Sequence, residues 1–272
     1  MSAFFHVMFL PFLACLILTG IHAYLGLHVI ERQVIFVDLA LAQIAALGAS
    51  FALVFGYGME SGYSYWMSLG FTLAGAAIFS FTRFKRQRVS QEAIIGITYA
   101  VSAALLILVL SRSGEGDEHI KQALVGNILL IQAPEVFKVF VIYSLIGLFH
   151  YIFRNKFLLI SHNPEEAYRQ GINVRLWDFL FYASFGFVVT SSVRIAGVLL
   201  VFSFLVVPSV AAILFSNKVK TRLVLGWIVG FAASVLGMAV SYFLDFPTGA
   251  SVVCTFGLIL IVLSIKSIFI KK

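Results

Sequence analysis

Long apolar segments follow one another along nearly the whole 272-residue chain, and they constrain its fold more than any other feature. An apolar helix needs about 20 residues to cross the hydrocarbon core of a bilayer. Backbone groups in lipid must bond within the chain, and these segments lack the alternation of barrel strands, so we expect helices. The sequence predicts an all-α, polytopic membrane helix bundle of roughly nine spans, near residues 3–30, 34–57, 63–82, 92–111, 136–153, 176–193, 195–216, 223–243 and 250–268.

Composition agrees with this class, because 61% of the residues are hydrophobic and only 11% are charged. The mean hydropathy of +1.02 lies far outside the range of soluble domains. The first apolar segment has no basic region before it and is too long for a cleaved signal, so we interpret it as a span. We expect one membrane domain over residues 1–272, with no room for a globular enzyme.

The basic residues predict the orientation of the chain. With nine spans, 15 of the 19 Lys and Arg residues fall in connections on one side of the membrane. The positive-inside rule then places the N-terminus outside and the C-terminus in the cytoplasm. The net charge of +7 follows from this topology, so it does not indicate a nucleic-acid partner. Residues 120–135 are apolar but too short to span, and could lie on or dip into the outer surface.

One cytoplasmic connection, SHNPEEAYRQGINVR, carries the signals of a short helix of about two turns. An Asn can cap it, a Pro suits its first position, two Glu complement its positive end, and a Gly can close it. The segment is either an ordinary connector or a docking element for a cytoplasmic partner. Its candidate contact residues are Asn163, Pro164, Glu165, Glu166, Ala167, Tyr168 and Gly171.

Several polar side chains fall inside or at the ends of predicted spans, where a charge is costly and normally faces a cavity or a partner. Asp38 and Gln43 lie in the second span, but residues five apart point about 140° apart on a helix and cannot form a two-ligand clamp. His22 and His28 flank the end of the first span, and each either contacts the substrate or satisfies a helix contact. Asp245 could cap the following helix or line the outer mouth.

The acid at the start of the sixth span, Asp178, is expected only to complement a helix N-terminus. Motifs of nucleotide or hydrolytic chemistry do not occur, including G-x-x-x-x-G-K-[ST], H-E-x-x-H and G-x-S-x-G. Any energy from a nucleotide must therefore come from another subunit, and we expect the chain itself not to be an enzyme.

Four stretches in order along the chain carry a resemblance to a known family. They are GLHVIERQVIFVDLALAQIAALGAS, EEAYRQGINV, VRIAGVLLVFSFLVVPSVAA with Gly197 and Pro208, and DFPTGASVV. Together they resemble the membrane permeases of bacterial ABC importers for zinc, manganese and iron, over nearly the full chain. The resemblance implies a relative of the vitamin B12 importer permease fold, with one fewer N-terminal span, in the bacterial inner membrane.

The resemblance also implies the partners. These are a second copy of the chain, two ATPase subunits that hold ATP and magnesium, and a binding protein that delivers the ion. No cofactor is expected on this chain. Residues 163–173 would form the coupling helix that contacts the ATPase.

The second span departs from the pattern of that family, which reads G-D-x-L-S/A-H-A with an acid and a histidine four residues apart. Gln43 stands at the histidine position, Leu39 at the acid position, and Asp38 where Gly is usual. Asp245 matches the acid of the family's D-x-P-x-G motif. The candidate path residues are therefore Asp38, Gln43, Asp245, His22 and His28, with Asp38 and Asp245 as possible metal ligands.

Three alternatives remain open at this point. The cargo of the importer could be a chelated metal, such as a siderophore, corrinoid or haem, because Gln offers only a neutral oxygen. The chain could instead be a secondary transporter driven by an ion gradient, which predicts inverted repeats that the sequence does not show. A membrane scaffold without transport activity is a third.

Overall fold

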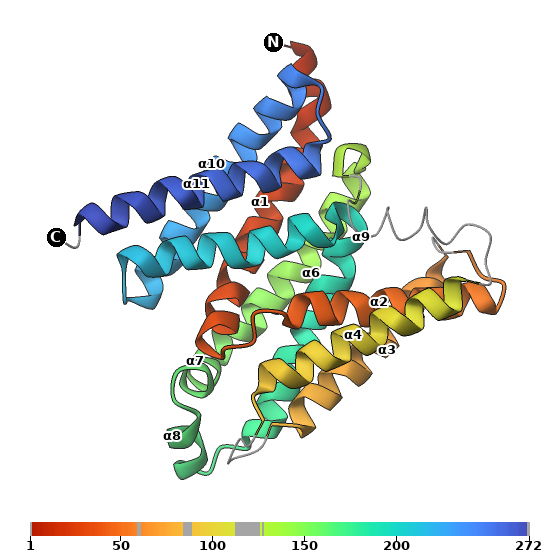
Figure 1. Ribbon diagram of the computed structural model, residues 1–272, viewed down its shortest axis with the longest axis vertical. Coiled ribbons are helices and arrows are strands. Elements are labelled where there is room, and N and C mark those ends of the chain that lie inside the picture. Colours follow the sequence, from red (N-terminus) through yellow and green to blue (C-terminus); the bar gives the residue numbers. More distant parts are fainter. Residues whose placement is uncertain (1, 59–60, 84–88, 112–125, 127, 271–272) are drawn as a thin grey trace. The chain divides into compact units, whose positions relative to one another are not determined.

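The structure, a computed structural model, describes residues 2–58, 61–83, 89–111, 126 and 128–270. Within these residues every regular element is a helix (Figure 1). The elements are α1 (Ser2–Glu31), α2 (Val37–Val54), α3 (Gly62–Phe81), α4 (Gln91–Leu110), a 3₁₀ turn η1 (Ile128–Leu130), α6 (Ala133–Ile152), α7 (Arg154–His162), α8 (Pro164–Arg169), α9 (Val174–Phe215), α10 (Val219–Leu244) and α11 (Thr248–Ile270).

The all-α prediction is confirmed, and the expected spans appear as eight long apolar helices in the described part of the chain. The number differs because segments 176–193 and 195–216 both fall in α9. The 42 residues of α9 are enough for two spans of about 20 residues each. Its backbone is non-helical at Gly197, with φ 75° and ψ 161°, a conformation open to glycine. α9 thus consists of two helices that meet at a kink.

The chain folds into two compact units, each built from separate stretches of sequence. Unit 1 comprises residues 1–30, 124–147 and 192–272, and unit 2 comprises residues 31–123 and 148–191. In unit 1, α10 packs against α11 so closely that a Cβ added at Gly237 would lie 2.6 Å from the Cα of Val252. This approach of two backbones is what small residues permit in membrane helices.

In unit 2, α2 is the central element and packs against both α3 and α4. Of the 18 residues in its span, 61% are buried, against 22% for the corresponding window of α4. A Cβ added at Gly48 of α2 would lie 2.7 Å from the carbonyl oxygen of Met67 in α3, so the two backbones touch there. Most of α2 is therefore enclosed by protein, which decides where its polar residues can point.

Seven of residues 120–135, for which we expected a surface or re-entrant segment, lie outside the described residues. The described part consists of Gly126, η1, residues 131–132 and the start of α6. The prediction of one domain over residues 1–272 stays a prediction.

Candidate functional site

Asp38 and Gln43 of α2 point to different sides of that helix, as the sequence predicts. Asp38 lies in the first turn and is buried, with a relative exposure of 2%. Its Oδ1 accepts a hydrogen bond from the backbone N–H of Leu39 at 2.7 Å. Gln43 is half-buried and shares the more open face of α2 with Leu39 and Ala46. The open face therefore carries an amide oxygen and apolar groups, while the carboxylate is enclosed.

A second carboxylate, Glu92, lies near Asp38 in unit 2. Glu92 is the second residue of α4, and its Oε1 accepts a hydrogen bond from the backbone N–H of Phe36 at 3.1 Å. Its Oε2 is buried and has no hydrogen-bond partner among the residues that the structure describes. Glu92 therefore attaches the start of α4 to the residue that precedes α2.

Glu92 was not among the site residues predicted from the sequence. Glu92 follows the N-cap Ser90 in the first turn of α4, where an acid commonly complements the helix dipole. This common role gives no indication of a contact with another part of the chain. The contact of Glu92 with the backbone of Phe36 depends on α4 packing beside the start of α2, which only the tertiary structure provides.

His22 and His28 of α1 are both buried in unit 1. His22 hydrogen-bonds through Nδ1 to the carbonyl oxygen of Leu18 at 2.9 Å, and its Nε2 lies 3.4 Å from Oγ of Ser192. His28 packs edge to face against Tyr24, with ring centroids 4.7 Å apart. These contacts agree with the interpretation in which each histidine bonds to or packs against neighbouring helix residues. A role of either ring in contacting substrate stays a prediction.

Asp245 ends α10, and its side chain is exposed in unit 1. Its backbone adopts the left-handed conformation, with φ 54° and ψ 39°. The turn to α11 is held by Ser241, whose Oγ donates to the carbonyl oxygen of Phe246 at 2.8 Å and lies 2.9 Å from Oγ1 of Thr248. Asp245 is therefore the C-cap of α10, and its carboxylate is accessible.

The path residues expected from the sequence are divided between the units: Asp38 and Gln43 belong to unit 2, and His22, His28 and Asp245 belong to unit 1. Among the described residues, no three His, Cys, Asp or Glu side chains converge in a way that would hold a metal ion.

The short helix predicted in the connection after α6 is α8. Asn163 is its N-cap, and the Asn163 side chain accepts a hydrogen bond from the backbone N–H of Glu166 at 3.1 Å. Pro164 occupies the first position, and Gly171 has a φ of 73° just beyond the end. Ala167 is buried, whereas Glu165 is exposed. The local signals in the sequence thus predicted this helix correctly.

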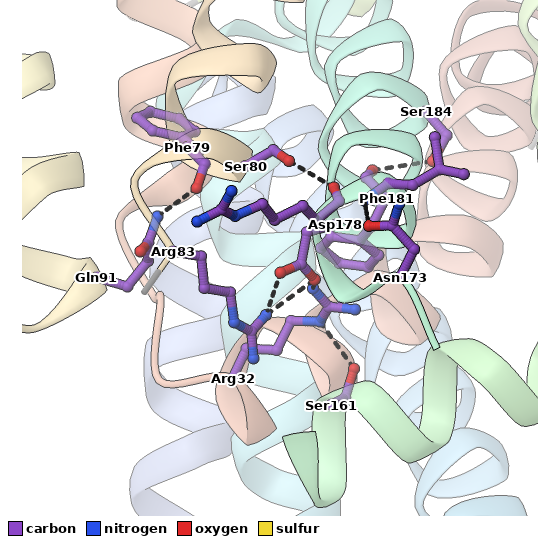
Figure 2. A network of polar contacts seen from close by, with 12 residues as sticks. Arg32, Phe79, Ser80, Arg83, Gln91, Ser161, Asn173, Asp178, Phe181 and Ser184 are labelled. Atoms are coloured by element: carbon purple, nitrogen blue, oxygen red, sulfur yellow. Dashed lines mark hydrogen bonds and ion pairs between the residues drawn. The ribbon is translucent and has the colours of Figure 1, made fainter. Parts of the chain in front are cut away.

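A buried charge network forms around Asp178 near the start of α9, and it was not predicted from the sequence (Figure 2). Asp178 of α9 is fully buried and binds two arginines. Nη1 of Arg32 donates to its Oδ1 at 2.6 Å, and Nη1 of Arg83 lies 2.9 Å from Oδ1 and 2.8 Å from Oδ2. The prediction that Asp178 only complements a helix N-terminus was wrong. A carboxylate in this position instead neutralises buried guanidinium groups.

The network joins several elements at one end of unit 2. Nε of Arg32, in the α1–α2 connection, donates to Oγ of Ser161 in α7 at 2.8 Å. Ser80 near the end of α3 donates to the carbonyl oxygen of Arg175 in α9 at 2.5 Å. Gln91 at the start of α4 donates to the carbonyl oxygen of Phe79 at 2.7 Å. The ends of α3, α4, α7 and α9 therefore meet, as alternating spans require of connections on one side of a membrane.

The sequence was compared with models of protein families and with known proteins. The ABC 3 transport family matches residues 4–267. The manganese import system permease protein ScaB of Streptococcus gordonii is 24% identical over 258 residues, which cover 95% of this chain and 90% of that protein. The chelated iron transport system membrane protein YfeD of Yersinia pestis is 26% identical over 169 residues, covering 62% of this chain and 57% of YfeD.

Among solved structures, the chain is similar to one in the complex of PsaBC from Streptococcus pneumoniae with a Fab. The TM-score is 0.78 with 22% sequence identity, and the match covers 95% of this chain and 91% of the other.

Proposed function

The chain belongs to the ABC 3 transport family, and from this premise we propose that it is the permease subunit of an ATP-driven importer for a divalent metal ion, namely zinc, manganese or iron. The observation that carries the proposal is the family match over residues 4–267, which includes α8 and all but the outermost residues of the long apolar helices that the structure describes. The names of its relatives, which refer to manganese and chelated iron transport, support the cargo.

The proposed assembly contains two copies of this chain, two ATPase subunits that hold ATP and magnesium, and a substrate-binding protein. It lies in the bacterial inner membrane, with the N-terminus outside and the C-terminus in the cytoplasm. The excess of Lys and Arg on one side supports this orientation. α8 would be the coupling helix, because it is short, capped at both ends and carries an exposed Glu165.

The proposed path involves Asp38, Gln43 and Asp245. The open face of α2 offers only the neutral oxygen of Gln43 as a donor, so an ion passing along it would be held weakly. Asp38, which is buried in the first turn of α2, would act from behind this face. The accessible carboxylate of Asp245 would act at the outer end.

Reconstitution of the chain with its ATPase tests the proposal directly. The purified complex in liposomes should take up radiolabelled manganese, zinc or iron only when ATP is supplied on the ATPase side. In that system Asp38→Ala should abolish uptake while the ATPase still co-purifies. Uptake of metal by the chain alone, with an ion gradient and no ATPase, would instead identify a secondary transporter.

The second candidate cargo is a chelated metal. The absence of an acid and an imidazole at Leu39 and Gln43 favours it, because a chelate already satisfies the coordination of its metal. Competition separates the two: an excess of a siderophore, corrinoid or haem should leave manganese uptake unchanged if the free ion is the cargo, and should suppress it if the chelate is.

A further inference from the structure

α7 and α8 are joined without a flexible linker. Asn163 is both the C-cap of α7 and the N-cap of α8, so one non-helical residue separates the two helices. Its backbone N–H donates to the carbonyl oxygen of Leu159 at 2.8 Å, and its side chain accepts from Glu166 at 3.1 Å. A displacement of α8 therefore moves α7 with it.

α7 packs on α9 through Phe157, whose ring centroid lies 5.4 Å from that of Trp177 and 6.3 Å from that of Phe181, and it is also attached to α9 by polar contacts of the Arg32 side chain. Ser161, in the last turn of α7, accepts a hydrogen bond from Nε of Arg32 at 2.8 Å, and Nη1 of the same guanidinium donates to Asp178 of α9 at 2.6 Å (Figure 2). The ring of Phe181, one turn further along α9, lies 4.0 Å from the guanidinium carbon. Because the guanidinium is a rigid planar fork, these contacts fix the direction from α7 to α9.

The same carboxylate also anchors α3. Both oxygens of Asp178 accept from Nη1 of Arg83, which follows the end of α3. Inside unit 2, Asp178 thus contacts both Arg32, which bonds to Ser161 of α7, and Arg83, which follows α3.

We propose that Arg32 and Ser161 are positioning residues that transmit displacement of α8 to the first turns of α9 and, through Asp178, to α3. This inference rests on the proposed function and deepens it, since it assigns the route by which an ATPase bound to α8 acts on the spans. Neither residue needs to touch the ATPase or the cargo. Their effect is on the ratio of ions moved to nucleotides hydrolysed.

The test compares variants of the reconstituted permease–ATPase complex. Ser161→Ala removes the bond from α7 to Arg32 and leaves the ion pairs in place. Ser161→Thr keeps the hydroxyl group and serves as the conservative rescue. Ser184→Ala is the matched control, because Ser184 is also a helix serine of unit 2 and bonds to the ring of His150 at 2.8 Å and to the carbonyl oxygen of Phe181 at 2.9 Å, so the substitution leaves the bonds among Ser161, Arg32 and Asp178 in place. Arg32→Lys keeps the charge but cannot bond to Ser161 and Asp178 with one rigid group.

The measurement is radiolabelled manganese imported per phosphate released, in parallel with the amount of ATPase that co-purifies. Ser161→Ala and Arg32→Lys should lower the ratio by about two- to thirtyfold, the range found when residues along a coupling route are changed. Ser161→Thr and Ser184→Ala should retain the parental ratio, and all four variants should hold the ATPase.

An unchanged ratio in Ser161→Ala would overturn the inference and leave the proposed function standing. An equal loss in Ser161→Ala and Ser184→Ala would also overturn it, because the effect would then be general loosening of unit 2. If the parental complex imports no metal with ATP, the proposed function fails and the inference fails with it.

Discussion

Removing the carboxylate of Asp178 should destabilise the protein more than most single substitutions. The side chains of Arg32 and Asp178 are both 0% exposed, and that of Arg83 is 10% exposed. Arginine stays protonated in proteins, so Asp178→Ala leaves two guanidinium groups charged and unpaired in the interior. Breaking a buried ion pair by removing one partner costs about 3–5 kcal/mol. One carboxylate serves two arginines here, which favours the upper end of that range.

The assay is thermal unfolding of the purified chain in detergent, followed by the loss of monodisperse protein at one fixed heating rate. For a chain of this size about 2–4 °C corresponds to 1 kcal/mol in soluble proteins, so Asp178→Ala should lower Tm by roughly 6–20 °C. Asp178→Asn keeps the volume and one acceptor oxygen, and should lie between the parent and Asp178→Ala. A Tm of Asp178→Ala within about 2 °C of the parent would refute the reasoning, since that shift corresponds to at most about 1 kcal/mol.

Three further predictions follow from the packing and the caps. Gly237→Ala should destabilise the protein by about 1–3 kcal/mol in thermal unfolding, because the new Cβ would lie 2.6 Å from the backbone of α11. A Cβ at Gly257 would have no atom within 4 Å, so Gly257→Ala should be neutral or stabilising in the same assay. Asn163→Ala should cost α8 about 0.5–2 kcal/mol of cap energy, seen as faster amide hydrogen exchange at residues 164–169. The double variant Leu39→Asp, Gln43→His places an acid and an imidazole four residues apart on the open face of α2, so the purified chain should retain more zinc than the parent. Unchanged zinc retention would contradict that geometry.

The elements that the sequence predicted are those with local causes. The length of an apolar segment needs no knowledge of its neighbours, so the spans were found, and the break in α9 was placed within a few residues of Gly197. The signals of α8 lie between Asn163 and Gly171, and each acts on an adjacent backbone group. The opposite directions of Asp38 and Gln43 follow from the pitch of a helix alone.

The features that the sequence did not predict depend on partners far away in the chain. Asp178 pairs with Arg32, which lies 146 positions earlier, and no local pattern records that distance. α7 was not predicted, because its basic first turn resembles an ordinary connection. Its buried face, formed by Phe157, Ile160 and Ser161, is evident only in the tertiary structure. Arg32 and Arg83 were interpreted only as topology signals, since positive charge beside a span has that common explanation.

The charge network needs a reason beyond stability. A buried ion pair is weak evidence for stabilisation, because apolar side chains of similar volume often hold the same space equally well or better. The triple variant Arg32→Met, Arg83→Met, Asp178→Leu should therefore unfold close to the parent temperature, while Asp178→Ala alone does not. If Arg32 orients α7 relative to α9, the same triple variant should hydrolyse ATP with its partner and import little metal. A triple variant that is both stable and fully coupled would mean that apolar packing alone can orient these helices, and the network would then have no part in transmitting movement from α8.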